Sequence, residues 1–479
     1  MRRVCLPLLV ALIVLMIGSS VLAQDAEKPN ILFVFADDQC FQTVGAMGNP
    51  EIQTPNIDTL VESGTVFTHA YNMGSWSGAV CVASRTMLNT GRFIWRANAV
   101  YNKTETEREE GRFWSEMMKA AGYDTYMTGK WHVRADANLA FDTAVDVRGG
   151  MPSQTPTGYN RPIEGEEDPW SPSDPKFGGF WEGGRHWSEV VADHAVDYLG
   201  TASEDEDPFF MYIAFNAPHD PRQSPQEFVD MYPWQDILVP ENYMDEYPYN
   251  EPMSSGRGLR DEKLAPFPRT HYAVQVNRQE YYAIITHMDR EIGRILEALE
   301  ASGKADNTYI FYSADHGLAC GQHGLMGKQN LFDHSTRVPL YVIGPDVPAG
   351  EQRDGAVYLQ DIMATSLELA DAPGREYVEF QSLMPIIEGD REANYEAVYG
   401  AYLASQRSIT LAGYKLILYP KATKSLLFDL ENDPLEMTDL SDEPEQQARM
   451  KSLFAALLEL QDEMEDTLNL EAVYPELCE

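Results

Sequence analysis

Residues 28–38 read KPNILFVFADD, and this stretch determines the fold more than any other. Its apolar core, residues 31–35, is continuous and does not alternate with polar residues, which is typical of a strand covered on both faces of a sheet. Two carboxylates, Asp37 and Asp38, follow directly. The stretch therefore predicts a buried parallel strand that delivers two acidic side chains to one edge of a sheet.

Three more apolar runs of this kind lie further along the chain, separated by segments with helical spacing. The runs are residues 125–127, 209–215 and 309–312, and residues 285–299 repeat apolar side chains as a helix packed on a sheet does. Strands that alternate with helices are typical of an α/β domain. We expect a large mixed, mostly parallel sheet flanked by helices.

The last part of the chain has a different pattern. Two strand-like segments, 409–419 and 425–430, precede an amphipathic helix that carries apolar residues from Met450 to Met464. We therefore predict a catalytic domain over residues 28–375 and a smaller C-terminal α+β subdomain over residues 376–479, with a small antiparallel sheet and a terminal helix.

Composition limits the possible functions. The chain has 479 residues, enough for two or three domains, and its hydrophobic content of 44% excludes a disordered or low-complexity protein. It carries 36 Lys and Arg against 75 Asp and Glu, a formal net charge of −39. A field of that sign repels polyanions, so we do not expect nucleic acid as a partner.

The first 23 residues have the layout of a secretory signal peptide. Arg2 and Arg3 precede an apolar run over residues 6–17, and small residues up to Ala23 suit cleavage there. A permanent membrane anchor is the alternative, but the run is short for a membrane span. We expect a signal peptide over residues 1–23, a secreted or periplasmic mature protein, and no membrane association after cleavage.

The cysteines do not form a disulfide framework. Cys5 leaves with the signal peptide, and the other four are scattered over a long chain: Cys40, Cys81, Cys320 and Cys478. Because Cys40 and Cys320 each follow an acidic cluster, a disulfide between them is conceivable.

Each predicted strand of the main sheet is followed by a polar cluster. The clusters are residues 37–38, 129–132, 218–220 and 315–317. One such cluster alone could be a helix cap or a turn. Four of them at the carboxyl ends of parallel strands should converge on one site.

The acidic members of these clusters predict a metal site. Asp37, Asp38 and Asp315 cannot lie close together in ionised form unless a cation offsets their repulsion. Oxygen ligands of this kind select Ca²⁺ or Mg²⁺. The neighbouring His316 keeps manganese or zinc open, because imidazole is a common ligand of transition metals.

Positively charged groups fall around the same strand ends. They are Arg85, Lys130 and Lys328, together with His132 and His219. The lysines could be ordinary surface residues. Gathered at one site of an acidic protein, however, these groups predict that the site binds an anion.

One further motif leads to a family. Residues 81–85 read CVASR and lie in the stretch GSWSGAVCVASR. Further motifs occur along the chain: TPNID at 54–58, GKWH at 129–132, APH at 217–219, SADHG at 313–317, GQHG at 321–324 and GK at 327–328. This ordered set resembles the type I sulfatases of the alkaline phosphatase superfamily. Ala83 stands where that family usually has Pro, and His316 where many members have Asn.

The resemblance implies a modified nucleophile and a metal. A formylglycine-generating enzyme would oxidise Cys81 to 3-oxoalanine (formylglycine), whose hydrate attacks sulfur. One divalent ion is implied, with Ca²⁺ expected and Mg²⁺ or Mn²⁺ as alternatives. The implied metal ligands are Asp37, Asp38, Cys81, Asp315 and His316, and the implied catalytic residues are Cys81, Arg85, Lys130, His132, His219 and Lys328.

The expected substrate is a sulfated small molecule or saccharide. Long irregular stretches, roughly residues 143–186 and 220–275, favour a carbohydrate, because loops of that length often form binding walls. Two alternatives stay open: a phosphonate or phosphate ester hydrolase on the same scaffold, and an unmodified, inactive relative that binds sulfated glycans. The sequence does not fix the oligomeric state.

Other aromatic residues and histidines allow two interpretations each. Trp170, Trp181 and Trp187 could stack on a sugar ring or form the core of a loop. His323 and His334 could line the site or be ordinary hydrogen-bonded residues, whereas the helical pattern around His194 indicates a structural role.

Overall fold

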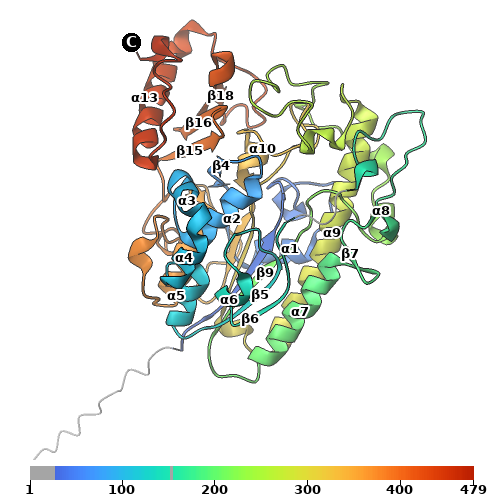
Figure 1. Ribbon diagram of the computed structural model, residues 1–479, viewed down its shortest axis with the longest axis vertical. Helices are drawn as coiled ribbons and strands as arrows, with labels where there is room; N and C mark the ends of the chain where they lie inside the picture. The colour runs from blue at the N-terminus through green and yellow to red at the C-terminus, as the bar shows by residue number, and fades with distance from the viewer. Residues whose placement is uncertain (1–26, 151–154, 479) are drawn as a thin grey trace, which may run out of the picture.

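The computed structural model describes residues 27–150 and 155–478 (Figure 1). The predicted signal peptide lies outside the described residues. Among the helices that the structure does describe, none is both long and apolar enough to cross a bilayer.

The centre of the molecule is an eight-stranded sheet in the order β13-β2-β12-β10-β1-β9-β5-β6. β1 (Asn30–Ala36) pairs in parallel with β10 (Thr308–Ala314) on one side and β9 (Phe209–Ala214) on the other, and β9 pairs in parallel with β5 (Asp124–Lys130). These are the four strands that the apolar runs predict. The predicted fold class is confirmed.

The remaining strands of this sheet extend it at both edges. β6 (Thr143–Arg148) continues the parallel set, while β12 (Leu340–Ile343) pairs antiparallel with β10 and with β2 (Thr65–Phe67), and β13 (Glu351–Arg353) closes the edge. A three-stranded sheet is formed by β11 (Arg337–Val338), β3 (Ala70–Tyr71) and β14 (Val357–Tyr358).

Helices cover the sheet from both sides (Figure 1). On one side, α7 (Trp187–Ala202) runs beside the long α9 (His271–Ala301), which also contacts α1 (Pro55–Ser63). The opposite side carries α2 (Val80–Thr90) and α5 (Trp114–Ala120). The shorter helices are α3 (Ile94–Val100), α4 (Thr104–Glu109), α6 (Ala137–Ala140), α8 (Gln226–Asp230), α10 (Asp333–Thr336), α11 (Asp361–Leu369) and α12 (Met384–Ile387).

The core explains why the strand sequences lack alternation. Phe33 of β1 contacts the rings of Trp114 and Tyr212, and all three side chains are fully buried. Burying a large aromatic side chain contributes roughly 1.5–3 kcal/mol, so a strand covered on both faces gains this on each side. The TPNID motif has a structural role here, because Asp289 of α9 accepts hydrogen bonds from the N–H groups of Asn56 and Ile57 at the start of α1.

The C-terminal region forms a second sheet. β15 (Ala397–Tyr402), β16 (Gln406–Leu411), β17 (Tyr414–Tyr419) and β18 (Lys424–Asp429) are antiparallel neighbours, and α13 (Gln447–Met464) packs on them. The predicted segment 409–419 is therefore a hairpin, turning at Ala412 and Gly413, which both have positive φ. β4 (Gly74–Ser75) pairs with β15, so the segment before Cys81 joins this sheet. The domain boundary after residue 375 stays a prediction.

The long irregular stretches contain few regular elements. Residues 155–186 include the short hairpin of β7 (Trp181–Glu182) and β8 (Arg185–His186) and two single turns of 3-10 helix. Between residues 220 and 270 the regular elements are α8 and two further short 3-10 helices. Trp170 and Trp187 are buried, and Trp170 packs on Phe177. Their surroundings favour the loop-core interpretation over sugar stacking for these two residues.

The proposed disulfide is wrong. Cys40 and Cys320 are both buried and free. Sγ of Cys320 instead lies 3.7 Å from Nη1 of Arg222, and the backbone N–H of Cys40 donates to Tyr281. The structure therefore shows two free thiols where the sequence allows a disulfide.

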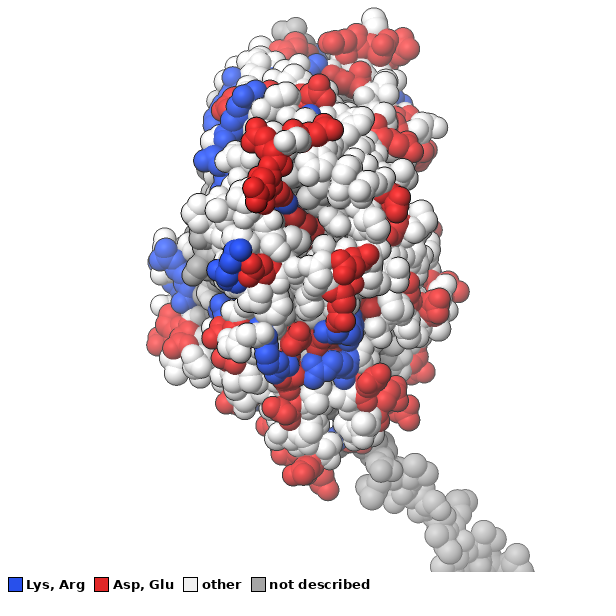
Figure 2. Space-filling model, turned by 90° about the vertical axis from the view of Figure 1, so that its right-hand side faces the viewer, with Lys and Arg blue, Asp and Glu red and all other residues white. Residues whose placement is uncertain are grey.

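The surface agrees with the net charge. On the face that Figure 2 shows, acidic side chains are spread over most of the surface, and basic side chains form small groups beside them. His194 belongs to such a surface pair, with Nε2 2.7 Å from Oδ2 of Asp146, in keeping with a structural role.

A buried ion-pair cluster joins the second sheet to the loop that follows β10. Lys415 of β17 pairs with Asp333 of α10 and lies 2.7 Å from Oε1 of Glu436, and all three side chains are almost fully buried. Removing the cation would leave Glu436 without a basic partner, and Asp333 with Arg337 alone at 3.6 Å, in a medium of low dielectric constant.

We therefore expect Lys415→Met to lower the free energy of unfolding by about 3–5 kcal/mol in chemical denaturation. The control is Lys424→Met, because Lys424 pairs with Asp439 at 2.9 Å in a partly exposed position, where an ion pair contributes at most about 1 kcal/mol. Equal losses in the two variants would contradict this assignment.

Candidate active site

The carboxyl ends of four parallel strands meet at one place. Asp37 and Asp38 follow β1, Lys130 ends β5, and Asp315 follows β10. The backbone N–H of Asp37 donates to the carbonyl of Ala217, which follows β9, at 3.0 Å. The sheet itself therefore places the four predicted clusters together.

Cys81 enters the site from the first turn of α2. Its side chain is buried, and Sγ lies 3.3 Å from Nε2 of His316, 3.4 Å from Nζ of Lys328 and 3.8 Å from Oδ1 of Asp38. Burial alone would raise the pKa of this thiol, but Lys130, Lys328 and His316 together lower the pKa well below its usual value. The position is therefore built to hold negative charge on residue 81.

Three cations neutralise the three carboxylates. Nε of Arg85 donates to Oδ2 of Asp315 at 2.9 Å, Nζ of Lys328 donates to Oδ2 of Asp38 at 2.6 Å, and Lys130 pairs with Asp37. Neither lysine is an ordinary surface residue, since both are buried. These pairs are charge-assisted and lie in a nearly dry environment, so they hold the side chains in fixed positions.

The donor set fits a divalent cation. Ligand atoms of the five predicted metal ligands all lie within 4.8 Å of one another: Asp37, Asp38, Cys81, Asp315 and His316. Oδ1 of Asp37 has no hydrogen-bond partner among the described residues. Burial and the nearby Asp315 raise the pKa of Asp37 well above its usual value, which is the repulsion that a bound cation would relieve.

The orientation of His316 suits metal binding as well. Nδ1 lies 2.8 Å from the carbonyl oxygen of Gly317, and this contact requires a proton on Nδ1. Nε2 then faces Oδ1 of Asp38 at 3.1 Å as the nitrogen available to a ligand. A second hydrogen bond that fixes the ring in this way is common at metal-binding histidines.

Two site residues adopt a backbone conformation that L-residues avoid. Asp38 has φ of 68° and His132 has φ of 55°. Left-handed backbone at a non-glycine residue costs of the order of 1–3 kcal/mol and persists only where the surroundings impose it.

The two remaining predicted histidines border the cluster. Nε2 of His219 is 3.6 Å from Oδ2 of Asp38, and Nδ1 is 2.7 Å from the carbonyl oxygen of Asp220. His132 is partly buried, burial lowers its pKa, and a hydrogen bond to Cys81 opposes that shift. The structure thus brings every predicted site residue to one place.

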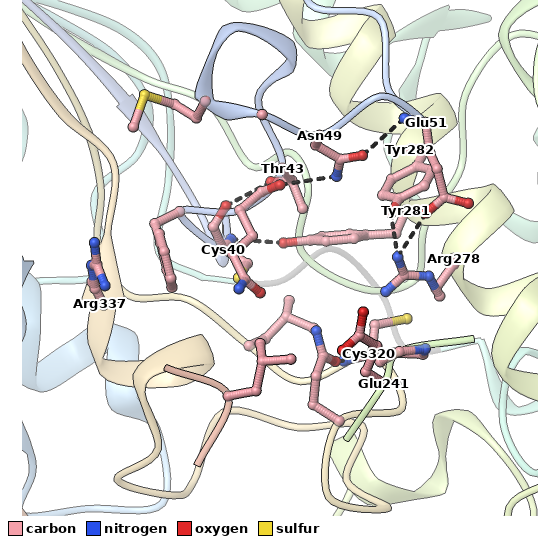
Figure 3. Close-up of a pocket in the computed structure, with 18 of the residues that line it drawn as sticks. Cys40, Thr43, Asn49, Glu51, Glu241, Arg278, Tyr281, Tyr282, Cys320 and Arg337 are labelled. Atoms are coloured by element: carbon pink, nitrogen blue, oxygen red, sulfur yellow. Dashed lines mark hydrogen bonds and ion pairs between the residues drawn. The ribbon is translucent and has the colours of Figure 1, made fainter. Parts of the chain in front are cut away.

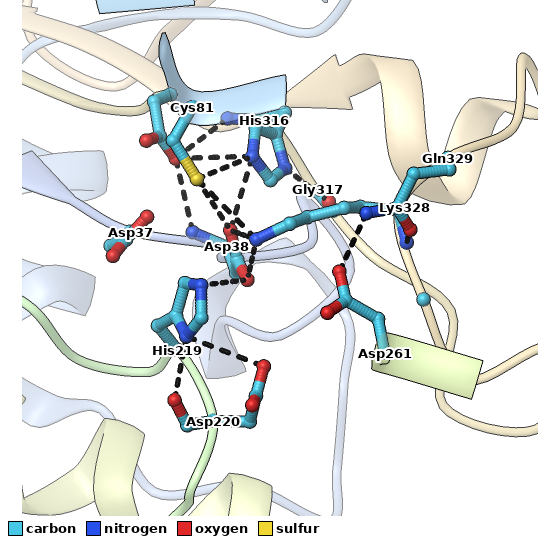
Figure 4. A network of polar contacts seen from close by, with 12 residues as sticks. Asp37, Asp38, Cys81, His219, Asp220, Asp261, His316, Gly317, Lys328 and Gln329 are labelled. Carbon is cyan, nitrogen blue, oxygen red and sulfur yellow. Dashed lines mark hydrogen bonds and ion pairs between the residues drawn. The ribbon is translucent and has the colours of Figure 1, made fainter. Parts of the chain in front are cut away.

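Beyond His219, Asp220 of the predicted cluster 218–220 is joined in a polar wall by residues that the sequence does not indicate. Asp220 accepts from the hydroxyl of Tyr159 at 3.0 Å and lies 3.4 Å from Nη2 of Arg260. Arg260 also pairs with Asp261, which accepts from Gln329 beside Lys328 (Figure 4). Arg260 lies in an irregular stretch, so no periodic pattern or motif indicates it.

His323 and His334 lie outside the catalytic cluster. Their rings are 3.4 Å apart between Nδ1 and Nε2, and His323 also contacts the carbonyl oxygen of Glu436. Both are buried in the connection to the second sheet, so their surroundings favour the structural interpretation.

The strand ends of the mostly parallel sheet hold buried carboxylates and basic side chains, and a thiol lies beside them at the start of a helix. This combination is that of a hydrolase of the alkaline phosphatase superfamily. A family model described as Sulfatase matches residues 29–372, and one described as N-sulphoglucosamine sulphohydrolase, C-terminal, matches residues 321–463. The chain belongs to the sulfatase family and is a sulfatase enzyme. The resemblance seen in the sequence is confirmed.

Curated relatives match over most of the chain. An arylsulfatase of Clostridium perfringens is 27% identical and covers 90% of this chain and 94% of its own length. An N-acetylglucosamine-6-O-sulfatase of Bacteroides thetaiotaomicron is 25% identical, and the match covers 92% of this chain and 88% of that protein.

Solved structures share the fold. One, a complex with its substrate D-glucosamine-2-N,6-O-disulfate, has a TM-score of 0.72 at 22% identity and covers 92% of this chain and 99% of its own. A phosphonate monoester hydrolase of Agrobacterium radiobacter has a TM-score of 0.70 at 20% identity, and the match covers 91% of this chain and 96% of that protein.

The metal site can be tested by thermal unfolding. Because a ligand that binds only the folded state stabilises it, Ca²⁺ at 100 times its dissociation constant should add about 2.7 kcal/mol and raise the unfolding temperature of chelator-treated protein. Asp37→Asn should remove most of this increase.

The control is Asp207→Asn, which changes a second acidic group, Asp124, Asp205 and Asp207, that is largely exposed. This variant should keep the full Ca²⁺ response. A response that is lost in Asp207→Asn and kept in Asp37→Asn would place the ion elsewhere.

Proposed function

We propose that this sulfatase removes sulfate from a sulfated carbohydrate through a formylglycine made from Cys81. The observation that carries the proposal is the position of Cys81, whose Sγ lies within 3.4 Å of both Lys328 and His316 at the edge of the carboxylate cluster. An oxidised residue 81 would carry a hydrated aldehyde, a geminal diol in which one hydroxyl attacks sulfur and the other, once deprotonated, expels sulfate.

The metal proposed for the site is one Ca²⁺, with Mg²⁺ or Mn²⁺ as alternatives because of His316. Asp37, Asp38, Asp315, His316 and residue 81 would hold it. When bound, the ion draws negative charge from the sulfuryl oxygens and favours deprotonation of the attacking hydroxyl.

The basic side chains supply fixed positive charge where the transition state spreads negative charge. Lys130, Lys328 and Arg85 are held by their carboxylate partners, so little reorganisation is needed during the reaction. Donors positioned in this way contribute about 3–4 kcal/mol each in comparable oxyanion sites.

Two histidines are the proposed proton carriers. His219 has the carboxylates of Asp38 and Asp220 beside its two ring nitrogens, an arrangement that can hold a proton at Nε2 for the departing alcohol oxygen as the S–O bond breaks. Lys328 can share this role. His132, whose pKa responds to the neighbouring Cys81, is the proposed acceptor of the proton of the second hydroxyl as sulfate leaves.

The polar wall beyond His219 supports a hydroxyl-rich leaving group. The contacts run from the buried His219 and Asp220 out to Arg260, whose side chain is 34% exposed. The alcohol released from sulfur would leave past these groups, and Asp220, Tyr159 and Arg260 offer the acceptors and donors that sugar hydroxyls need. The sulfated sugars named for the N-acetylglucosamine-6-O-sulfatase and for the solved complex of the same fold support the same substrate class.

The export of the protein is also proposed. The layout of residues 1–23 supports a secreted or periplasmic location after cleavage. Partners would be the saccharide substrate and, transiently, the formylglycine-generating enzyme.

A phosphonate or phosphate ester hydrolase is the second candidate. It is favoured by the fold shared with the phosphonate monoester hydrolase and by His316 in the donor set. An unmodified, inactive relative that binds sulfated glycans is the third.

The decisive experiment is mass spectrometry of the peptide that contains residue 81, combined with assays on matched aryl sulfate and aryl phosphate esters. Conversion of the thiol to the aldehyde lightens the peptide, and we expect converted protein to cleave the sulfate ester faster. Cys81→Ala should lose activity by a factor of at least 10³.

The outcomes separate the three candidates. Faster cleavage of the phosphate ester would favour the second candidate. An unconverted thiol with no activity, but with retained binding of sulfated glycan, would favour the third. Full activity in Cys81→Ala would refute the proposed nucleophile altogether.

A further inference from the structure

A buried tyrosine lies directly behind the loop that carries Asp37 and Asp38. The hydroxyl of Tyr281, in the middle of α9, donates to the carbonyl oxygen of Asp38 at 2.6 Å and accepts from the N–H of Cys40 at 2.9 Å. Figure 3 shows the ring pointing toward Cys40. A single hydroxyl therefore bridges both ends of the backbone segment from Asp38 to Cys40.

Asp38, whose carbonyl Tyr281 holds, has a strained backbone. Asp38 adopts a left-handed backbone with φ of 68°. An aspartate in this conformation needs contacts that impose it, because the Cβ atom disfavours it. Two such contacts are seen: the N–H of Asp38 donates to Oδ1 of Asp315 at 3.1 Å, and its carbonyl accepts from Tyr281.

Tyr281 forms part of the wall between the metal cluster and a neighbouring cavity. The cavity has a volume of about 490 Å³, and its lining includes Cys40, Tyr282 and Cys320 (Figure 3). The guanidinium of Arg222 lies over the Tyr281 ring at 4.9 Å. The ring is 2% exposed and borders this cavity, and its hydroxyl contacts fix its position toward Asp38.

We propose that Tyr281 is a positioning residue for the metal. Its hydroxyl holds the backbone of Asp38 in the conformation that turns the Asp38 carboxylate toward Asp315, His316 and residue 81. Metal affinity then depends on a side chain that does not touch the metal. The inference rests on the proposed metal site.

The next residue along the helix is a matched control. Tyr282 is as fully buried as Tyr281 and lines the same cavity. Its hydroxyl lies 3.2 Å from Oε2 of Glu51 and contacts Arg278. Tyr281→Phe and Tyr282→Phe each remove one hydroxyl from the lining of the same cavity. Only Tyr281→Phe removes a contact to Asp38.

The experiment is a calorimetric titration of Ca²⁺ into the full chain after treatment with a chelator. Residues that orient metal ligands typically contribute about 10–100-fold to affinity, so Tyr281→Phe should raise the dissociation constant by at least about 10-fold. Tyr282→Phe should leave the dissociation constant at the wild-type value. If Tyr281→Phe unfolds without metal, the Ca²⁺ concentration that restores the fold replaces the dissociation constant in this comparison.

Two outcomes would overturn the inference: wild-type affinity in Tyr281→Phe, or an equal loss in both variants, which would indicate a general effect of the cavity wall. A wild-type chain that binds no Ca²⁺, Mg²⁺ or Mn²⁺ would instead refute the metal site itself. Failure of the proposed function and failure of this inference are thus distinguishable.

Discussion

Repulsion among three buried carboxylates is the constraint on which the rest of the site depends. Asp37, Asp38 and Asp315 lie close together where water is almost excluded, and each has its own cation. Those cations balance the three negative charges, so a divalent ion would give the site a net positive charge inside a protein of net charge −39. Such a site attracts an anionic ester, while the surrounding surface disfavours large polyanions.

The fold produces this arrangement through strand order. Neighbouring parallel strands bring residues almost 280 positions apart, such as Asp38 and Asp315, into direct contact. α2 then brings Cys81 in by its first turn, where backbone N–H groups and the helix dipole favour negative charge. β4, a few residues before Cys81, pairs with β15, so the second sheet anchors the segment that leads to the nucleophile.

The sequence predicts what depends on local pattern and motif. Buried parallel strands are continuous apolar runs, so the sequence predicts the four central strands, the polar clusters after them and the site residues that converge there. It does not predict Arg260, Tyr281 or Lys415, whose partners are distant in the chain. It also allows a disulfide between Cys40 and Cys320, but both thiols are free in the structure. Side-chain pairing across the fold leaves no periodic signal.

The most direct test of the central claim is a crystal structure of protein produced with a formylglycine-generating enzyme and grown in Ca²⁺. The account predicts one divalent ion bound by Asp37, Asp38, Asp315 and His316, with an oxygen in place of sulfur at residue 81 facing that ion. An unmodified thiol with no ion among these four side chains, in crystals of fully active enzyme, would contradict it.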